Sequence, residues 1–444
     1  MAVVAITAVV TLMVTAGHEG PSEATQRGLK LHQPGSAPSR GVPLHLSRVA
    51  SRVERLRGLA FESPPRVRVM SAAELAALGR RLNRGLARRA SGQPARLRRT
   101  ERLERALTGF QQLAGILPEQ PASDVTAGGP IEAIGGAYDN PRNRIILVQG
   151  AIETRQELRQ VLAHELTHAL EDQHFPLRLP ASIGLTQKAQ TRRALIEGTA
   201  TFVAARYASR YLSDQVPVKQ RLAGQRSIYA AGGSTPYAVK ATNIFDYVDG
   251  ALFIRELHRL ANGWSSVNRA LRHAPTRSQQ ILHPRAWRRG AAARPVHLDL
   301  GHLLDAEWRL VGGGPAGEQD AVAILGQGAF DAEAASGAAG WAGGRFELWR
   351  ARGDGSGCED CAAGEVGVVG FRWRGKLDTS QFARAFFAYM LGRLGERIGP
   401  RTWDLGEGFA SLRSARRASA IAFAPTDELA RAAAESAARH AAGR

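Results

Sequence analysis

The chain has 444 residues, 44% hydrophobic and 22% charged, which provides enough apolar material for two or three domains and excludes global disorder. Lys and Arg number 59 against 40 Asp and Glu, giving a formal net charge of +19. No nucleic-acid-binding motif accompanies this charge, so we expect no nucleic-acid partner. Two Cys residues exclude a small scaffold held together by disulfides.

The N-terminal residues form an apolar run, Ala2–Ala16, which contains no Lys or Arg. This run is shorter than the roughly 18–20 residues of a membrane span but has the length of a signal-peptide core, with small residues before Ala16. We therefore predict that residues 1–16 are a signal peptide or an N-terminal anchor, and that the protein is extracellular or associated with the cell envelope. A buried N-terminal strand or helix is the alternative. Residues 17–43, rich in Gly, Pro and Ser, predict a flexible stalk.

Helical and extended patterns then alternate up to residue 149. The first apolar residues recur at helical spacing until Pro64 and Pro65 stop the pattern. The stretches that follow predict, in chain order, a strand over 66–70, a helix over 71–90 with Ser71 as N-cap, a helix over 98–117, and a hairpin with strands at 131–138 and 144–149.

The segment VLAHELTHALEDQHF, residues 161–175, indicates a metal site. His164 and His168 are four residues apart, so on a helix both imidazoles lie on one face and can bind one Zn²⁺ at about 2.0–2.1 Å. Glu165 follows the first His, where its carboxylate can act as general base on a metal-bound water. The alternative is an ordinary buried helix with two satisfied His side chains.

Two residues compete as the third metal ligand. His174 has the spacing of the metzincin pattern, but that pattern has Gly where Glu171 stands, and Glu171 favours continuation of the helix. No Met lies between Met70 and Met390 to form the Met-turn of that class. Glu197 lies in a second apolar segment, ALIEGTATFVAARY, which predicts a helix that can pack on the first and present a carboxylate. We therefore favour Glu197.

The motif HELTHALEDQ resembles the zinc helix of thermolysin-type peptidases, the gluzincins, and Glu197 with Thr201 resembles their second, glutamate-bearing helix. The resemblance implies zinc bound by His164, His168 and Glu197. In that family the position of Thr201 is usually Asp, which orients a ligand His. Thr201 can accept an imidazole N–H through its hydroxyl. Asp172 is a second candidate for this role, with a solvated helix charge as the alternative.

A closer similarity is to exported bacterial proteins, regarded as zinc metallopeptidases, that carry HELxHALxDQHF, ALxEGxA and a later segment like StEQILHP. The corresponding segments here are residues 164–175, 194–200 and 278–284, the last reading SQQILHP. The chain departs from these proteins at Gln279, where they have an acidic residue, and at Gly344, where they tend to have Asp.

In gluzincin-like folds a strand beside the zinc helix holds the substrate as an added antiparallel strand, and the hairpin at 131–149 directly precedes this helix. A further donor is needed to stabilise the oxyanion. Candidates are Tyr247 in FDYVDGALF, His283 in SQQILHP and Tyr138 at the hairpin. Each also has a structural interpretation, the tyrosines at the edge of the core and His283 as a helix-end residue before Pro284.

Helical patterns continue to residue 287, so we assign 44–287 to a zincin-like domain, 288–300 to a linker and 301–444 to a smaller α+β domain. In this last part we expect helices near 317–327 and 378–393, strands near 345–351 and 365–373, and an Ala-rich terminal helix. Cys358 and Cys361 favour a disulfide in an oxidising compartment. A zinc ribbon would need a second Cys pair, and a thioredoxin-like motif would need a βαβ setting.

These patterns predict an α+β, mostly helical protein with a small β-hairpin sheet beside the HExxH helix. The expected activity is that of an exported zinc metalloendopeptidase acting on a peptide or protein substrate, with Zn²⁺ as cofactor and Glu165 as general base. A zinc-bearing envelope binding or maintenance protein with weak catalysis is the alternative. A third possibility, an adhesion module with structural zinc, leaves Glu165 without a role and lacks four protein ligands.

Overall fold

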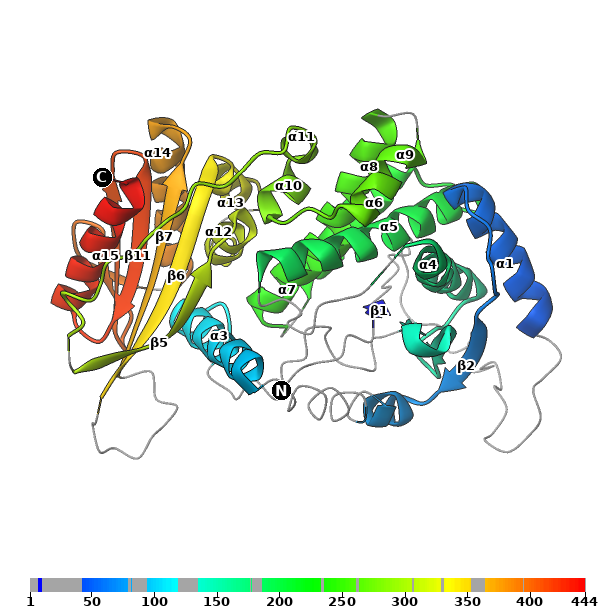
Figure 1. Ribbon diagram of the computed structural model, residues 1–444, viewed down its shortest axis with the longest axis horizontal. Helices are drawn as coiled ribbons and strands as arrows, with labels where there is room; N and C mark the ends of the chain where they lie inside the picture. Colours follow the sequence, from blue (N-terminus) through cyan, green and yellow to red (C-terminus); the bar gives the residue numbers. More distant parts are fainter. Residues whose placement is uncertain are drawn as a thin grey trace, which may run out of the picture.

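The computed structural model describes residues 7–9, 42–78, 81, 94–118, 135–175, 177, 186–232, 235–260, 263–305, 307–328, 331–352, 364–393 and 395–443. It confirms the α+β, mostly helical class. Figure 1 shows a helical part at one end and a large sheet at the other. No helix among these residues is long and apolar enough to cross a membrane. The predicted stalk up to residue 41, Cys358 and Cys361 lie outside the described residues.

A small sheet lies beside the HExxH helix, with strand order β1-β3-β4-β2. Its strands are β1 (Thr7–Val9), β2 (Arg66–Met70), β3 (Gly136–Asp139) and β4 (Arg144–Val148). The 3-10 turn η2 (Asn140–Arg142) joins β3 to β4 in an antiparallel hairpin, while β2 runs parallel to β4. The predicted strand at 66–70 and the hairpin from residue 136 are thus confirmed. β1, within the segment predicted as a signal peptide or anchor, pairs antiparallel with β3.

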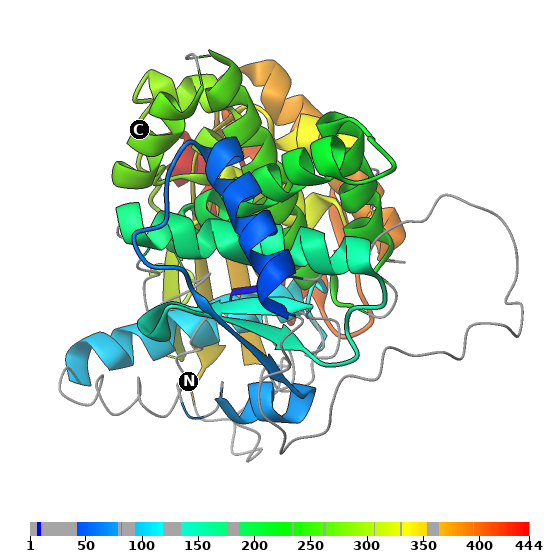
Figure 2. The same cartoon turned by 90° about the vertical axis from the view of Figure 1, so that its right-hand side faces the viewer.

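The helical part contains most of the helices between residues 42 and 288. They are α1 (Val42–Arg57), α4 (Arg155–His174), α5 (Gln187–Tyr211), α6 (Val218–Ala231), α7 (Tyr237–Asn243), the π-helix η3 (Ile244–Asp249), α8 (Gly250–Leu260), α9 (Trp264–Arg272), α10 (Ser278–Leu282) and α11 (Pro284–Arg288). Figure 2 shows α1 on the outer side of this bundle, where it packs on α4 and α5. Within the stretch predicted to be helical up to residue 287, the π-helix η3 leads directly into α8.

The second part is built on a seven-stranded antiparallel sheet of order β5-β6-β7-β11-β10-β9-β8, larger than the short sheet expected. Its strands are β5 (Trp308–Pro315), β6 (Trp341–Ala351), β7 (Glu365–Trp373), β8 (Glu396–Gly399), β9 (Thr402–Asp404), β10 (Phe409–Ala415) and β11 (Ala418–Ala424). Its helices are α12 (Glu318–Leu325), α13 (Asp331–Ala338), α14 (Lys376–Gly392) and α15 (Asp427–Ala442).

The two faces of this sheet have separate cores because side chains alternate along each strand. In β7, Val366 and Val368 face the Ala-rich helix α15, whereas Val369 and Phe371 face the core that contains α12, α13 and α14. The same core also includes residues of α3 (Pro94–Leu113), among them Phe110. A helix from the N-terminal half of the chain therefore packs on the C-terminal sheet.

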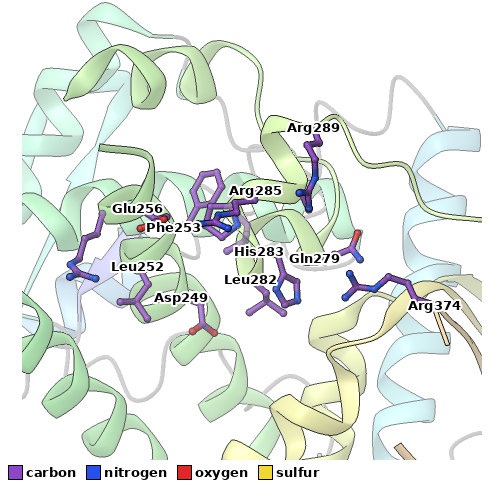
Figure 3. Close-up of a pocket in the computed structure, with 14 residues that line it drawn as sticks. Asp249, Leu252, Phe253, Glu256, Gln279, Leu282, His283, Arg285, Arg289 and Arg374 are labelled. Atoms are coloured by element: carbon purple, nitrogen blue, oxygen red, sulfur yellow. The ribbon is translucent and has the colours of Figure 1, made fainter. Parts of the chain in front are cut away.

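Residues 289–300, most of the predicted linker, form no helix or strand. Val296 and Leu300 are nevertheless buried, in clusters with residues of the sheet and of α15. The chain thus follows the sheet surface after leaving α11. A pocket lies near the point where the chain leaves α11 for the sheet. It is bordered by α8, α10 and α11, and Arg374, just after β7, lines it from the side of the sheet (Figure 3).

Candidate metal centre

The HExxH helix α4 has a well-defined start. Thr154 is its N-cap, and its hydroxyl accepts a hydrogen bond from the Glu157 backbone N–H at 3.1 Å. The Glu157 carboxylate in turn accepts from the Thr154 N–H at 3.0 Å, which completes a capping box. As predicted, the helix continues through Glu171, and it ends only at His174. His164 and His168 therefore lie one turn apart on one buried face.

The second helix, α5, brings Glu197, which lies 33 residues after His164, to these histidines. It is capped by the Thr186 hydroxyl and buried along most of its length. Immediately after Glu197 the helix crosses the start of α8 at Gly198. A Cβ on Gly198 would lie 2.2 Å from the carbonyl carbon of Gly250, so the two backbones approach too closely for any side chain.

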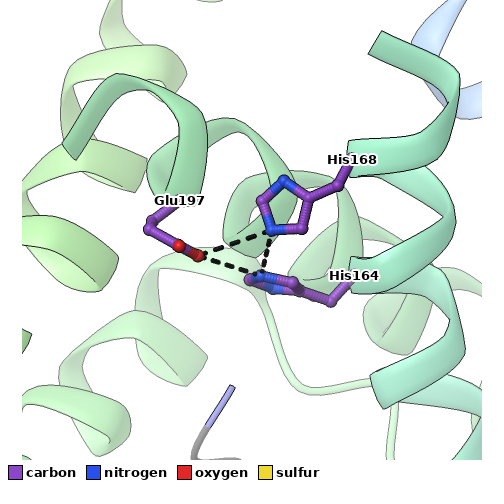
Figure 4. Close-up of side chains that lie close together, drawn as sticks. All are labelled: His164, His168 and Glu197. Atoms are coloured by element: carbon purple, nitrogen blue, oxygen red, sulfur yellow. Dashed lines mark hydrogen bonds and ion pairs between the residues drawn. The ribbon is translucent and has the colours of Figure 1, made fainter. Parts of the chain in front are cut away.

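Two imidazole nitrogens and one carboxylate oxygen meet between α4 and α5 (Figure 4). The Nε2 atoms of His164 and His168 are 3.0 Å apart, and they lie 3.2 Å and 3.5 Å from Oε2 of Glu197. Ligands held at 2.0–2.1 Å around a tetrahedral Zn²⁺ are roughly 3.3 Å apart. All three side chains are buried. The cluster therefore has the donor set and the spacing of a metal site, and it includes Glu197 rather than His174.

The electrostatics keep His164 and Glu197 in their metal-binding protonation states. Burial, opposed by the hydrogen bond with Glu197 and assisted by His168, lowers the pKa of His164 to about 4. Burial by itself raises the pKa of Glu197, but hydrogen bonds with His164 and His168 outweigh it and lower the pKa to about 2. At neutral pH His164 is therefore a neutral imidazole and Glu197 a carboxylate, the forms that coordinate metal ions.

Glu165 lies beside the cluster and is fully buried. Among the described residues, neither carboxylate oxygen has a hydrogen-bond partner. Burial, and then the charge of Glu197, raises its pKa well above the usual value. The hairpin strand β3 lies directly on this side chain, because a Cβ on Gly136 would be 3.2 Å from Cγ of Glu165 and 2.7 Å from Val161. A buried carboxylate without a hydrogen-bond partner destabilises the folded state. Its presence here indicates that Glu165 interacts with a group that is not part of the described chain.

Tyr247, one of the three predicted oxyanion donors, lies in this region. Its ring centroid is 6.2 Å from that of His164, and burial followed by the charge of Glu197 raises its pKa well above the usual value. It is carried by the π-helix η3, an element often found at functional sites. Tyr229 from α6 packs on it with ring centroids 5.9 Å apart.

Sequence reasoning missed three residues around the cluster. Tyr229 is one, and the other two are Arg193 and Asp246, whose side chains form a partly buried ion pair. Arg193 lies four residues before Glu197, and this helical spacing was an available signal. Asp246 immediately precedes Tyr247, so the ion pair ties the π-helix to α5.

The structure does not bring His283 to this cluster. Its Nε2 lies 2.7 Å from Oε1 of Glu318 on α12, and His283 lines the pocket between α8, α10 and α11, whose walls include none of the clustered residues. His174 is also directed elsewhere, with its Nε2 2.7 Å from the backbone oxygen of Ala60.

Asp172 and Thr201 were the two residues considered for orienting a ligand histidine, and neither forms a hydrogen bond with His164 or His168 among the described contacts. Asp172 accepts a hydrogen bond from the Tyr138 hydroxyl at 3.1 Å, so the third oxyanion candidate is tied to the end of α4. The Thr201 hydroxyl is buried without a hydrogen-bond partner among the described residues, and Nδ1 of His168 is in the same state. The expected Thr201–imidazole hydrogen bond is therefore not formed.

No protein-family model matches this chain, and neither the curated proteins nor the solved structures contain a significant match. The resemblance to gluzincins thus rests on the HExxH motif, the Glu197 segment and the geometry of the cluster.

Proposed function

We propose that this protein is a zinc-dependent endopeptidase of the gluzincin type, acting on peptide or protein substrates outside the cytoplasm. The observation that carries the proposal is the buried cluster of His164, His168 and Glu197 with the unpaired carboxylate of Glu165 beside it. A purely structural zinc site would use four protein ligands. Among the described residues only three donors gather here, which leaves a coordination position for water.

Zinc in this site would supply Lewis acidity, polarising a carbonyl and making a bound water more acidic. The residues of the chain then have distinct tasks. Glu165 takes a proton from the attacking water on a carboxylate oxygen and passes it to the leaving amine. Burial raises its pKa, which makes the carboxylate a stronger base, and a zinc ion nearby would favour the ionised form that this task requires. The raised pKa of Tyr247 keeps its phenol protonated, so that it can donate a hydrogen bond to a developing oxyanion.

We place an extended substrate along the outer edge of β3. β3 lies on Glu165 at Gly136, and its outer edge pairs in the structure with Thr7–Val9 in antiparallel register, Val9 opposite Gly136. The edge therefore accepts an added strand beside the general base. Removal of residues 1–16 as a signal peptide would free it for substrate.

Metal analysis and a proteolysis assay test the proposal together. The purified wild-type protein is expected to contain one zinc per chain and to hydrolyse casein. His164→Ala and Glu197→Ala should lose both zinc and hydrolysis, whereas His174→Ala, a matched control on the same helix as His164, should keep both. Glu165→Gln should retain zinc and lose hydrolysis by a factor of about 10² or more, the contribution of a general base.

Each failure has a separate meaning. Zinc retained by Glu197→Ala would refute the assigned ligand set. Zinc bound as expected without hydrolysis of casein or of a mixed peptide library would refute the peptidase and favour the envelope binding protein. Hydrolysis that survives in Glu165→Gln would remove this residue from the mechanism.

A further inference from the structure

The pocket bordered by α8, α10 and α11 is separate from the metal cluster and lies at the boundary between the helical part and the large sheet. Its volume is about 490 Å³, within the range of about 300–1,000 Å³ that is typical of small-molecule sites. The SQQILHP segment forms much of its wall, through Gln279, His283 and the apolar residues between them. The metal centre makes no use of this segment. A hollow of about 400 Å³ with Arg285, Arg288 and Arg289 in its wall adjoins it.

The wall of this pocket carries an excess of positive charge. Its four arginines are Arg255, Arg285, Arg289 and Arg374. The guanidinium groups of Arg285 and Arg289 make no hydrogen bond or ion pair with another described residue. Figure 3 shows Arg289 and Arg374 extending toward the same space from opposite sides, with His283 and Gln279 between them.

The acidic groups at the pocket are already paired. Asp249 forms an ion pair with Arg226, and Glu256 forms one with Arg259 at 2.8 Å. Neither of these two arginines lines the pocket. Behind the wall, Glu318 is buried and paired with His283, which fixes that imidazole in the wall. After the hydrogen bond with Arg259, the charge of Arg285 also contributes to lowering the pKa of Glu256, so Arg285 and Glu256 partly offset each other. No acidic side chain of the wall, however, forms an ion pair with Arg289.

We infer that this pocket binds a small anion bearing phosphate groups, held by Arg285, Arg289 and Arg374. Guanidinium groups match phosphate oxygens in bidentate geometry. Several converging cations favour an anion with more than one charge over a single carboxylate. The same chemistry is presented by a free oligophosphate and by a phospholipid headgroup. The inference does not depend on the proposed peptidase activity, because none of these residues contacts the metal cluster.

Isothermal titration calorimetry with sodium pyrophosphate, at constant ionic strength, tests the site. We expect saturable binding of one pyrophosphate per chain. Arg289→Ala and Arg374→Ala should each weaken it about tenfold or more, the effect of losing charge-assisted hydrogen bonds. Arg289→Lys, which keeps the charge without the fork, should have an intermediate affinity. The matched control is Arg309→Ala on β5, which removes the same charge from an exposed position outside the pocket and should leave binding unchanged.

Two further experiments test whether pyrophosphate binds at this pocket rather than at zinc, and whether the natural ligand is a lipid headgroup. Pyrophosphate also binds zinc, so the titration is repeated after dialysis against a chelator, and the inferred site should keep its affinity. Sedimentation with phosphatidylglycerol vesicles, against phosphatidylcholine vesicles, shows whether a lipid headgroup is the source, since pyrophosphate should then compete. The inference is overturned if binding is lost with the metal, if it is not saturable, or if Arg289→Ala behaves like Arg309→Ala.

Discussion

The crossing of α5 and α8 at Gly198 and Gly250 permits a demanding test of the structure. Alanine at position 198 would place its methyl carbon 2.2 Å from the carbonyl carbon of Gly250 and 2.6 Å from its oxygen. Ordinary contacts begin at 3.4 Å, so the helices would have to separate by about 1.2 Å at this point. The opposing atoms belong to the backbone, so no side-chain rotation can relieve the overlap.

The expected loss of stability follows from two opposing effects. Overpacking a well-packed core costs about 1–3 kcal/mol, and a clash with backbone lies at the upper end of that range. Replacing Gly by Ala within a helix returns about 1 kcal/mol through helix propensity. We therefore expect Gly198→Ala to lower the free energy of unfolding by about 2 kcal/mol. Because Glu197 precedes Gly198 and Tyr247 lies just before Gly250, zinc affinity should fall as well.

Urea unfolding followed by circular dichroism measures the first effect, and competition with a zinc chelator measures the second. Gly224→Ala in α6 is the matched control, because nothing lies within 4 Å of the added Cβ. This control should be neutral or more stable by up to about 1 kcal/mol. If Gly198→Ala were as stable as Gly224→Ala and bound zinc like the wild type, the close crossing of α5 and α8 would be refuted.

Three further predictions concern the surroundings of the site. Arg57→Met breaks the fully buried ion pair with Glu171 and should destabilise the protein by about 3–5 kcal/mol in urea unfolding. Burial already raises the pKa of Glu171, so without Arg57 the folded state should bind a proton more readily than the unfolded state. The loss of stability caused by Arg57→Met should therefore become smaller as the pH falls toward 4. A loss of stability that is independent of pH would contradict this explanation. Thr154→Ala removes the N-cap of α4 and should cost about 1 kcal/mol, while unchanged thermal stability would refute the capping box. Protein lacking residues 1–16 should show a several-fold higher kcat/KM on a peptide substrate than the chain that retains them, because β1 leaves the edge of β3; equal values would refute occupation of that edge.

The local elements of this protein are readable from its sequence. The four-residue spacing of His164 and His168 places both on one face of any helix, and Glu171 favours a helix that continues past them. The strand at 66–70 and the hairpin follow from short apolar runs separated by turn residues. These patterns depend only on helical and strand periodicity, which neighbouring residues determine. Further along the chain the same reasoning missed β5 and β8 to β11, of which β8 and β9 are short, with only four and three residues.

Contacts between distant segments required the tertiary structure. His283, Tyr247 and Tyr138 were all candidate oxyanion donors in the sequence, with Tyr138 the least favoured. Only Tyr247 lies beside the His164 ring, whereas Tyr138 donates a hydrogen bond to Asp172 and His283 pairs with Glu318. Helical phase decides which residues share a face, but not which faces meet. The meeting of α4 and α5, the crossing at Gly198 and the passage of α3 to the far sheet depend on how whole apolar surfaces pack, a property of the complete chain.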